Sequence, residues 1–317
     1  MARRQVPDLG VGVGLRVPHY SAILAEKPRV DFFEVISENF MVAGGKPLYH
    51  LDRVLEHYRV VQHGVSLGIA GPDEPDREYL KRLKQLVRRT KTPWVSDHFC
   101  WCGAGNAHLH DLLPIPYTAE AVRRTAERAR MIQDFLEVPF ALENTSSYLT
   151  YRSSTLSEWE FISEIAERAD IGLLFDVNNV YVSAYNHGFD AETFVRSVPH
   201  ERIFQIHLAG HTNLGKYIID THRGAVSDAV LALYRQTIAL TGPVSTLIEW
   251  DDEIPALEVL LAEAGRARRA RDEGLAARDG RSMPVLRTPS AAPAEASDVA
   301  GWKQGGPRES AANEALG

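Results

Sequence analysis

Short apolar runs alternate with longer amphipathic segments along most of the chain. Segments such as residues 77–90 and 119–136 repeat apolar residues at helical spacing. Between such segments lie eight runs with the length and composition of β-strands, at residues 10–16, 30–37, 60–69, 93–99, 138–144, 171–177, 202–210 and 244–250. Strands that alternate with helices in this way predict parallel β–α–β units.

The number of these units predicts an α/β fold of the (β/α)8 TIM-barrel type, because eight of them fit into about 260 residues. A doubly wound open sheet is the alternative. The barrel is favoured by the residues that end the runs, since the carboxyl ends of barrel strands face the reaction site. Most runs carry His, Asp or Glu at or near that end, namely Glu34 and Glu38, His63, Asp97 and His98, Glu143, Asp176, His207, and Glu249.

Histidines and carboxylates at so many strand ends predict a metal centre. Carboxylates crowded into one pocket repel each other unless cations neutralise them, and neutral imidazoles complete the coordination of such cations. The set contains no thiolate, lysine or arginine, which suits iron, manganese or zinc in a catalytic site rather than a structural zinc cage. It is also larger than one ion can use, so we expect two or three ions.

The segment 218–224, IIDTHRG, adds two more candidates. Asp220 and His222 are two residues apart and would face the same side of an extended chain. They form either an ion pair on a surface turn or two ligands of one ion. Gly224 would let the chain turn away directly after them.

The composition of the chain changes near residue 265. From there Ala, Arg, Gly, Pro and Ser dominate, and Trp302 is the only aromatic residue. Such a segment buries too little apolar area to offset its conformational entropy. We therefore predict a barrel domain over residues 1–264, followed over residues 265–317 by a fraying helix and a disordered Ala/Arg/Gly/Pro-rich tail.

Charge and cysteine content narrow the classes of partner. A net charge of -7 gives no electrostatic footprint for nucleic acid. The two cysteines, Cys100 and Cys102, cannot build a disulfide framework, which indicates a reducing compartment. No run approaches 18 apolar residues, and no secretory signal follows Met1. We expect a cytoplasmic protein without nucleic-acid or membrane partners.

A series of motifs in one order resembles a known enzyme family. The motifs are QHGVSLGI, SDHFCW, HDLLPIPYT, LENTSSY, FDVNNVYVSAYNHGFD, QIHLAGH, DTHRG and EWD, within residues 10–255. Together they resemble the multinuclear non-haem iron-dependent oxidative enzymes typified by the methanobactin biosynthesis B protein. The resemblance implies a xylose-isomerase-like barrel with two or three irons, as Fe(II) or Fe(III), and dioxygen as co-substrate. It also implies oxidative modification of cysteine in a ribosomally made precursor peptide, and a separate partner protein that binds the leader of that peptide.

The resemblance also assigns residues. The ligand spacing is also similar to that of the zinc-dependent apurinic endonucleases that share this barrel. The metal ligands that it implies are His63, His98, Glu143, Asp176, Asn179, His207, Asp220, His222 and Glu249. Asn179 stands where zinc-dependent apurinic endonucleases of the same barrel carry a histidine, and this weaker amide ligand argues against the nuclease. A divalent-metal-dependent hydrolase, phosphodiesterase or sugar isomerase on the same barrel is the alternative function.

Four residues are expected to act in catalysis. Glu143 and Asp176 are the expected bridging carboxylates, because oxygen donors can span two ions. His187 and His211 match further motif positions of the family and are expected near metal or substrate. The alternative is that His187 is a loop residue and that His211 only supports a ligand or lies in a loop.

Overall fold

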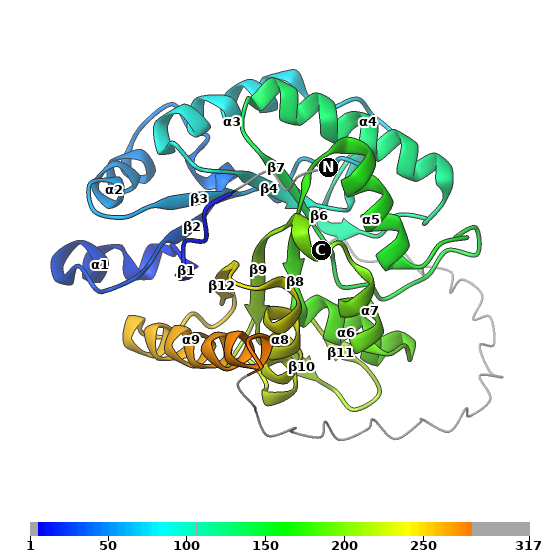
Figure 1. Ribbon diagram of the computed structural model, residues 1–317. Coiled ribbons are helices and arrows are strands. Elements are labelled where there is room, and N and C mark those ends of the chain that lie inside the picture. Colours follow the sequence, from blue (N-terminus) through cyan, green and yellow to red (C-terminus); the bar gives the residue numbers. More distant parts are fainter. Residues whose placement is uncertain (1–5, 106, 281–317) are drawn as a thin grey trace, which may run out of the picture.

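The computed structural model describes residues 6–105 and 107–280. Within these residues eight parallel strands close into a barrel in which chain neighbours are spatial neighbours (Figure 1). The barrel strands are β1 Val11–Gly14, β2 Phe33–Ile36, β3 Val60–His63, β4 Val95–His98, β7 Phe140–Glu143, β8 Gly172–Asp176, β9 Ile203–Ala209 and β12 Ser245–Glu249. Each of the eight predicted runs contains one of them, so the predicted TIM barrel is confirmed.

Helices surround the barrel. The α-helices are α1 Tyr20–Glu26, α2 Lys46–Leu55, α3 Arg77–Thr90, α4 Ala119–Leu136, α5 Glu158–Ala169, α6 Val177–His187, α7 Ala191–Ser197, α8 Asp228–Thr241 and α9 Leu257–Arg278. Side-chain caps fix several of their starts; Ser157 and Glu160, for example, form a capping box at the start of α5. Within the described ranges, no helix is long and apolar enough to cross a membrane.

The barrel interior has an apolar layer beneath a polar one. The apolar layer is a buried cluster separate from the main core, made of Leu9, Phe32, Val61, Trp94, Ala141, Leu174, Phe204 and Leu247. Residues two further along a strand point to the same side. The polar residues that follow Phe32, Val61, Ala141, Leu174 and Leu247 at this spacing are Glu34, His63, Glu143, Asp176 and Glu249. The apolar layer therefore closes the barrel floor and holds these polar side chains at its carboxyl end.

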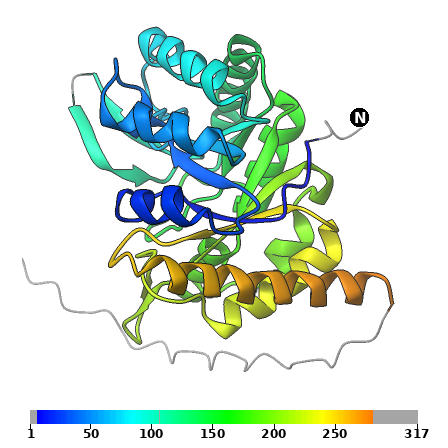
Figure 2. The same ribbon diagram turned by 90° about the vertical axis from the view of Figure 1, so that its left-hand side faces the viewer.

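Two hairpins in the loops at that end were not predicted from the sequence. β5 Trp101–Ala104 pairs with β6 Ala107–Leu113, and β10 Thr212–Asn213 pairs with β11 Ile218–Ile219, both antiparallel. The first hairpin stands out from the body of the molecule (Figure 2). Its sequence contains glycines and alternating polar residues rather than an apolar run, so its hydrophobic pattern gives no signal for a strand.

The last helix crosses the boundary that the composition predicts. α9 continues to Arg278 and lies along α8 (Figure 1), with Ala267 and Ala270 buried. A Cβ on Gly274 would lie 2.7 Å from the carbonyl oxygen of Arg235 on α8. Small residues after position 264 thus allow close helix packing in the part of the chain where the composition predicts a fraying helix. The predicted tail falls mainly on residues 281–317, which lie outside the described residues.

Candidate metal centre

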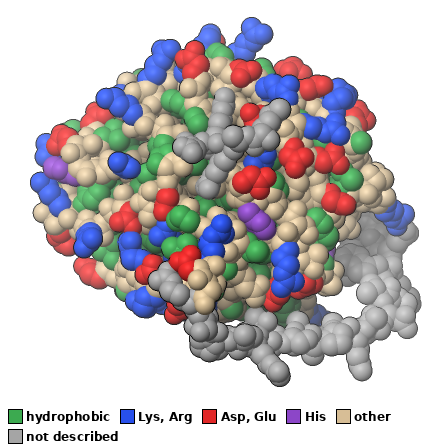
Figure 3. All heavy atoms as spheres, in the orientation of Figure 1, with side chains coloured by type: hydrophobic (Ala, Val, Ile, Leu, Met, Phe, Trp, Pro, Cys, Tyr) green, Lys and Arg blue, Asp and Glu red, His purple; other side chains and the backbone are tan. Residues whose placement is uncertain are grey.

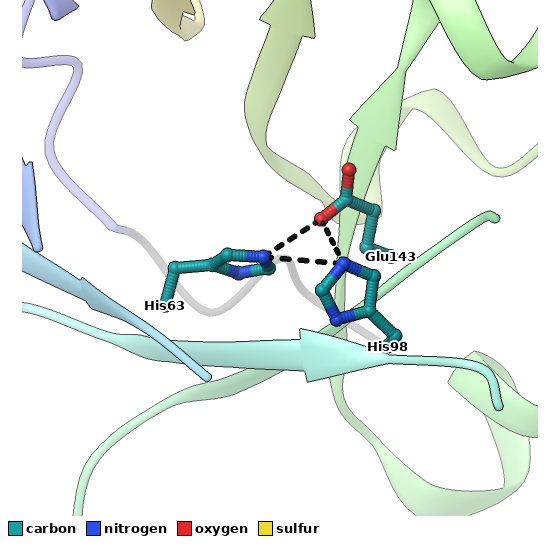
Figure 4. Close-up of side chains that lie close together, drawn as sticks. All are labelled: His63, His98 and Glu143. Carbon is teal, nitrogen blue, oxygen red and sulfur yellow. Dashed lines mark hydrogen bonds and ion pairs between the residues drawn. The ribbon is translucent and has the colours of Figure 1, made fainter. Parts of the chain in front are cut away.

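Three predicted ligands from neighbouring strands meet at the carboxyl end of the barrel. Nε2 of His63 and Nε2 of His98 lie 3.2 and 3.3 Å from Oε2 of Glu143. The two imidazole nitrogens are 3.3 Å apart (Figure 4). All three side chains are buried, and their facing atoms are close enough together to hold one metal ion.

The opposite ring nitrogens of both histidines have partners that fix their orientation. Nδ1 of His63 lies 2.9 Å from the hydroxyl of Ser96, and Nδ1 of His98 lies 3.1 Å from the carbonyl oxygen of Gly64. That carbonyl can only accept, so Nδ1 of His98 carries a hydrogen, and in the neutral ring the lone pair lies on Nε2, where a metal ion can bind it. Such support is typical of histidines that bind metals.

A second group shares Glu143 with the first. It consists of Glu143, Asp176, His207 and Glu249, all buried, with one atom from each close enough to hold an ion. Nδ1 of His207 lies 3.3 Å from Oε1 of Glu143 and 3.1 Å from Oε2 of Glu249. The two oxygens of Glu143 therefore face different groups.

One carboxylate oxygen of Asp176 caps a helix, and the other could bind a metal ion. Its Oδ1 accepts the backbone N–H of Asn179 at 2.6 Å and so caps α6. Its Oδ2 is buried without a hydrogen-bond partner among the described residues. The side-chain N–H of Asn179 donates to the carbonyl oxygen of Asn144, and this leaves the amide oxygen of Asn179 likewise buried without a partner.

The segment 218–224 brings Asp220 and His222 to the same end of the barrel. Nε2 of His222 lies 3.1 Å from Oδ1 of Asp220. Asp220 also accepts hydrogen bonds from Ser146 and Asn178. Gly224 has φ +80° and supplies the expected turn.

A third group lies at the rim. It contains His222, Glu249 and Asp251. His222 has φ +48°, a left-handed conformation that is uncommon for histidine; its carbonyl oxygen accepts the backbone N–H of Asp251 at 2.9 Å, which helps to hold it. Nε of Arg16 donates to Oδ1 of Asp251 at 2.7 Å, so a fixed positive charge already neutralises part of this group.

The described structure contains buried donor atoms that suit cations. Buried atoms without a hydrogen-bond partner among the described residues include Oε2 of Glu143, Oδ2 of Asp176, Oδ1 of Asn179, Nδ1 of His207, Nε2 of His222 and Oε2 of Glu249. Several of them have only ion-pair contacts, at 3.1–3.2 Å, and buried polar atoms that make no hydrogen bond are costly in a folded protein. Their oxygen and imidazole chemistry suits Fe, Mn or Zn, and these groups could hold metal ions.

Burial and crowding shift the pKa values of these groups. Burial lowers the pKa of His63 well below its usual value, and the positive charge of His98 lowers it further. Burial also disfavours the charged form of His98, but Glu143 is among the carboxylates that raise its pKa to about 9. Burial raises the pKa of Asp176, and the carboxylates of Glu143 and Asp220 raise it further. Bound cations would relieve the repulsion between these carboxylates.

A cavity of about 380 Å³ opens onto these groups. Predicted ligands contribute to its wall, together with Thr145, Ser146, Tyr148 and Leu149 from the loop after β7. Asp111 and residues 112–114 close another side. The cavity gives a bound molecule access to His98, Asn179, Asp220 and His222.

The other two predicted catalytic histidines lie further out. Nε2 of His187 is 2.9 Å from both the hydroxyl and the carbonyl oxygen of Ser147. Nδ1 of His211 is 2.7 Å from the side-chain oxygen of Asn178, whose N–H donates to Asp220 at 2.8 Å. Neither histidine belongs to the three groups of potential ligands found in the described residues.

Sequence reasoning missed the uncharged residues that hold the candidate ligands. Ser96, Asn178 and Ser146 all lie within the motifs quoted above, and so does Asp251 in the third group. The residue types of these serines and this asparagine do not by themselves indicate that they support metal ligands. The motifs were the only signal that could have found them.

Gly210 allows the segment 218–224 to approach β9. A Cβ at this position would collide with the carbonyl oxygens of Arg223 and Gly224, which are backbone atoms and cannot rotate away. We expect Gly210→Ala to displace His222, to lower the metal content, and to reduce stability by about 1–3 kcal/mol. Metal analysis and thermal unfolding test this. Gly44→Ala, with open space around its Cβ, is the control; wild-type metal content and stability in Gly210→Ala would contradict the prediction.

The fold and the site define a TIM barrel with buried His/carboxylate groups, able to hold metal ions, at the carboxyl ends of its strands. Residues 10–272 match the family model described as "RiPP precursor modification enzyme MbnB/TglH/ChrH". The chain belongs to this family, whose members act on precursors of ribosomally synthesised and post-translationally modified peptides (RiPPs).

Curated relatives match most of the chain. A UPF0276 protein of Anaeromyxobacter sp. is 48% identical over 276 residues, which cover 87% of this chain and 98% of the relative. A UPF0276 protein of Caulobacter vibrioides is 50% identical over 263 residues, covering 83% of this chain and 94% of the relative.

Solved structures share the fold at low sequence identity. The 3-keto-D-glucoside 4-epimerase of E. coli superposes with a TM-score of 0.54 at 11% identity, covering 82% of this chain and 99% of that chain. A xylose isomerase domain protein of Planctomyces limnophilus gives a TM-score of 0.50 at 14% identity, covering 84% and 99%. These similarities confirm a xylose-isomerase-like barrel.

Proposed function

We propose that this chain is a multinuclear iron enzyme that uses dioxygen to modify cysteine residues oxidatively in a precursor peptide. The observation that carries the proposal is the set of buried, unpartnered oxygen and imidazole atoms on predicted ligands, in a chain of a peptide-modifying family. Iron bound there would supply the redox chemistry with dioxygen. The proposed ligands are His63, His98, Glu143, Asp176, Asn179, His207, Asp220, His222 and Glu249.

The chain's own residues would have distinct roles. Glu143 would connect two ions, because its two oxygens face different groups. Asp176 would offer Oδ2 as a second bridging oxygen while Oδ1 caps α6. His211 would exchange protons at Nε2, since Asn178 engages its Nδ1; burial lowers its pKa and so favours the neutral ring. His187 would hold Ser147 in the loop whose neighbouring residues line the cavity.

The cavity limits what the barrel itself can bind. A volume of about 380 Å³ suits a cysteine side chain with a short stretch of peptide. A longer leader would therefore need another surface, and the proposal includes a separate leader-binding protein. Acidic and basic side chains are interspersed on the face shown in Figure 3, which supports the expectation that nucleic acid is not a partner.

The test is an anaerobic reconstitution with Fe(II), followed by addition of dioxygen and a Cys-containing precursor peptide encoded beside the gene. We expect dioxygen consumption and a mass change confined to cysteine-containing fragments. A peptide with those cysteines replaced by serine is the control and should remain unmodified. Full iron loading without any dioxygen-dependent mass change would contradict the proposal.

The same experiment distinguishes the alternative function. A divalent-metal-dependent hydrolase, phosphodiesterase or sugar isomerase would work with zinc or manganese and consume no dioxygen. We expect zinc-loaded protein to be inactive on the peptide and on phosphodiesters and sugars. Turnover of a phosphodiester or a sugar by the zinc or manganese form would support the alternative.

A further inference from the structure

Behind His207, on the side away from the candidate ligands, lies a buried hydrogen-bonded chain of side chains. Nε2 of His207 is 3.1 Å from Oε2 of Glu34, while its Nδ1 faces Glu143 and Glu249. Nε2 of Gln205 donates to the same oxygen of Glu34 at 2.5 Å. Trp94, Gln205, Glu34 and His207 are each at most 2% exposed, so these polar groups depend on one another for partners.

The chemistry of Trp94 fixes the orientation of the Gln205 amide in this chain. An indole N–H can only donate, and Nε1 of Trp94 lies 2.9 Å from Oε1 of Gln205. The amide of Gln205 must therefore turn its NH2 group towards Oε2 of Glu34 and Nε2 of His207, which lie 2.5 and 2.9 Å from its nitrogen. Glu34 then acts as the acceptor for Gln205, and Nε2 of His207 can either donate to Glu34 or accept from Gln205. A hydrogen bond to an ionised carboxylate is the stronger of the two, so Glu34 favours the ring with its hydrogen on Nε2.

We propose that Glu34 is a positioning residue that keeps the hydrogen of His207 on Nε2 and its lone pair on Nδ1, facing the candidate metal ligands. This inference rests on the proposed metal centre. A neutral imidazole has one donor and one acceptor nitrogen, and the partner of one nitrogen decides the role of the other. Without Glu34, the ring could hold its hydrogen on Nδ1 and point it at the cation.

Glu34 belongs to none of the potential ligand groups in the described residues, so its effect on metal binding would pass through His207. It comes from β2, and its hydrogen bonds link this strand to β9 across the barrel. Gln205 and His207 are two residues apart on β9, which places both side chains inside the barrel.

The test compares metal binding by full-length Glu34→Leu, Glu34→Gln and Trp94→Phe with that of wild type. Anaerobic Co(II) titration against a competing chelator gives the affinity and number of ions, and the visible spectrum reports the ligand field. We expect Glu34→Leu to weaken the binding of one ion by about 10–100-fold. The ion at His63, His98 and Glu143 should stay bound. Glu34→Gln and Trp94→Phe should weaken the same ion less, because each keeps a possible acceptor for His207.

Thr246→Val is the control for loss of a buried hydrogen bond, because Thr246 on β12 bonds to Tyr234 outside the site. It should bind metal like wild type. Wild-type affinity and spectrum in Glu34→Leu would overturn this inference alone, while a wild-type protein that binds no metal would overturn the proposed function. If Glu34→Leu does not fold, wild-type affinity and spectrum in Glu34→Gln overturn the inference.

Discussion

Replacing Glu143 with alanine is expected to remove more metal than replacing a ligand that belongs to one group only. Oε2 of Glu143 faces His63 and His98, and its Oε1 faces His207. Both of the buried ligand groups would lose a donor at once. We expect iron content near background and a loss of peptide oxidation of more than about a thousandfold, which corresponds to more than about 4 kcal/mol of transition-state stabilisation.

His98→Ala is the comparison that tests whether Glu143 is shared between two ligand groups. His98 belongs to one ligand group only, so its loss should weaken one ion and leave the other bound. Metal analysis of anaerobically reconstituted proteins, with circular dichroism to confirm the fold, measures both variants. If Glu143→Ala retained as much iron as His98→Ala, Glu143 would not connect the two groups.

The barrel could be predicted because its physical causes are local. Runs such as 171–177 and 202–210 are apolar over strand length, and amphipathic segments such as 119–136 carry the helical period. Parallel strands joined by such helices have few alternatives. The hairpin β5–β6 could not be predicted, because its polar sequence lacks the hydrophobic pattern of a strand. Its pairing depends on contacts that form only in the folded protein. The point at which the fraying helix gives way to the tail could not be located from composition, because small residues that pack between helices resemble those of disordered segments.

The candidate site could be predicted only as a set of residue types. His63, His98, Glu143 and Asp176 are recognisable because titratable residues at the ends of buried strands must meet at one end of a barrel. Their division into groups depends on which ring nitrogen or carboxylate oxygen faces which neighbour, and this is a property of the packed structure. The role of Glu34 illustrates the limit, since its partner His207 lies 173 residues away in the chain.

Metal affinity is expected to rise steeply with pH between about 6.5 and 9. Burial would lower the pKa of His98, but the carboxylates of Glu143 and Asp97 raise it from 6.5 to about 9 in the metal-free protein. An ion must displace that proton. The affinity should therefore increase by about tenfold for each pH unit and each displaced proton, or about a hundredfold from pH 6.5 to 8.5. Chelator competition with Co(II), corrected for the chelator's own protonation, measures this slope.

The stability of the metal-free protein should change in the opposite direction over the same range. A folded-state pKa above the unfolded value stabilises the folded protein fully below pH 6.5, and this contribution of His98 is lost as pH rises through about 9. Metal-free protein should thus unfold more easily at pH 8.5 than at pH 6.5, while metal protects it more strongly at the higher pH. Calorimetry in buffers of different ionisation enthalpy should also detect protons released on binding. A flat affinity with no released proton would show that His98 does not exchange its proton for metal.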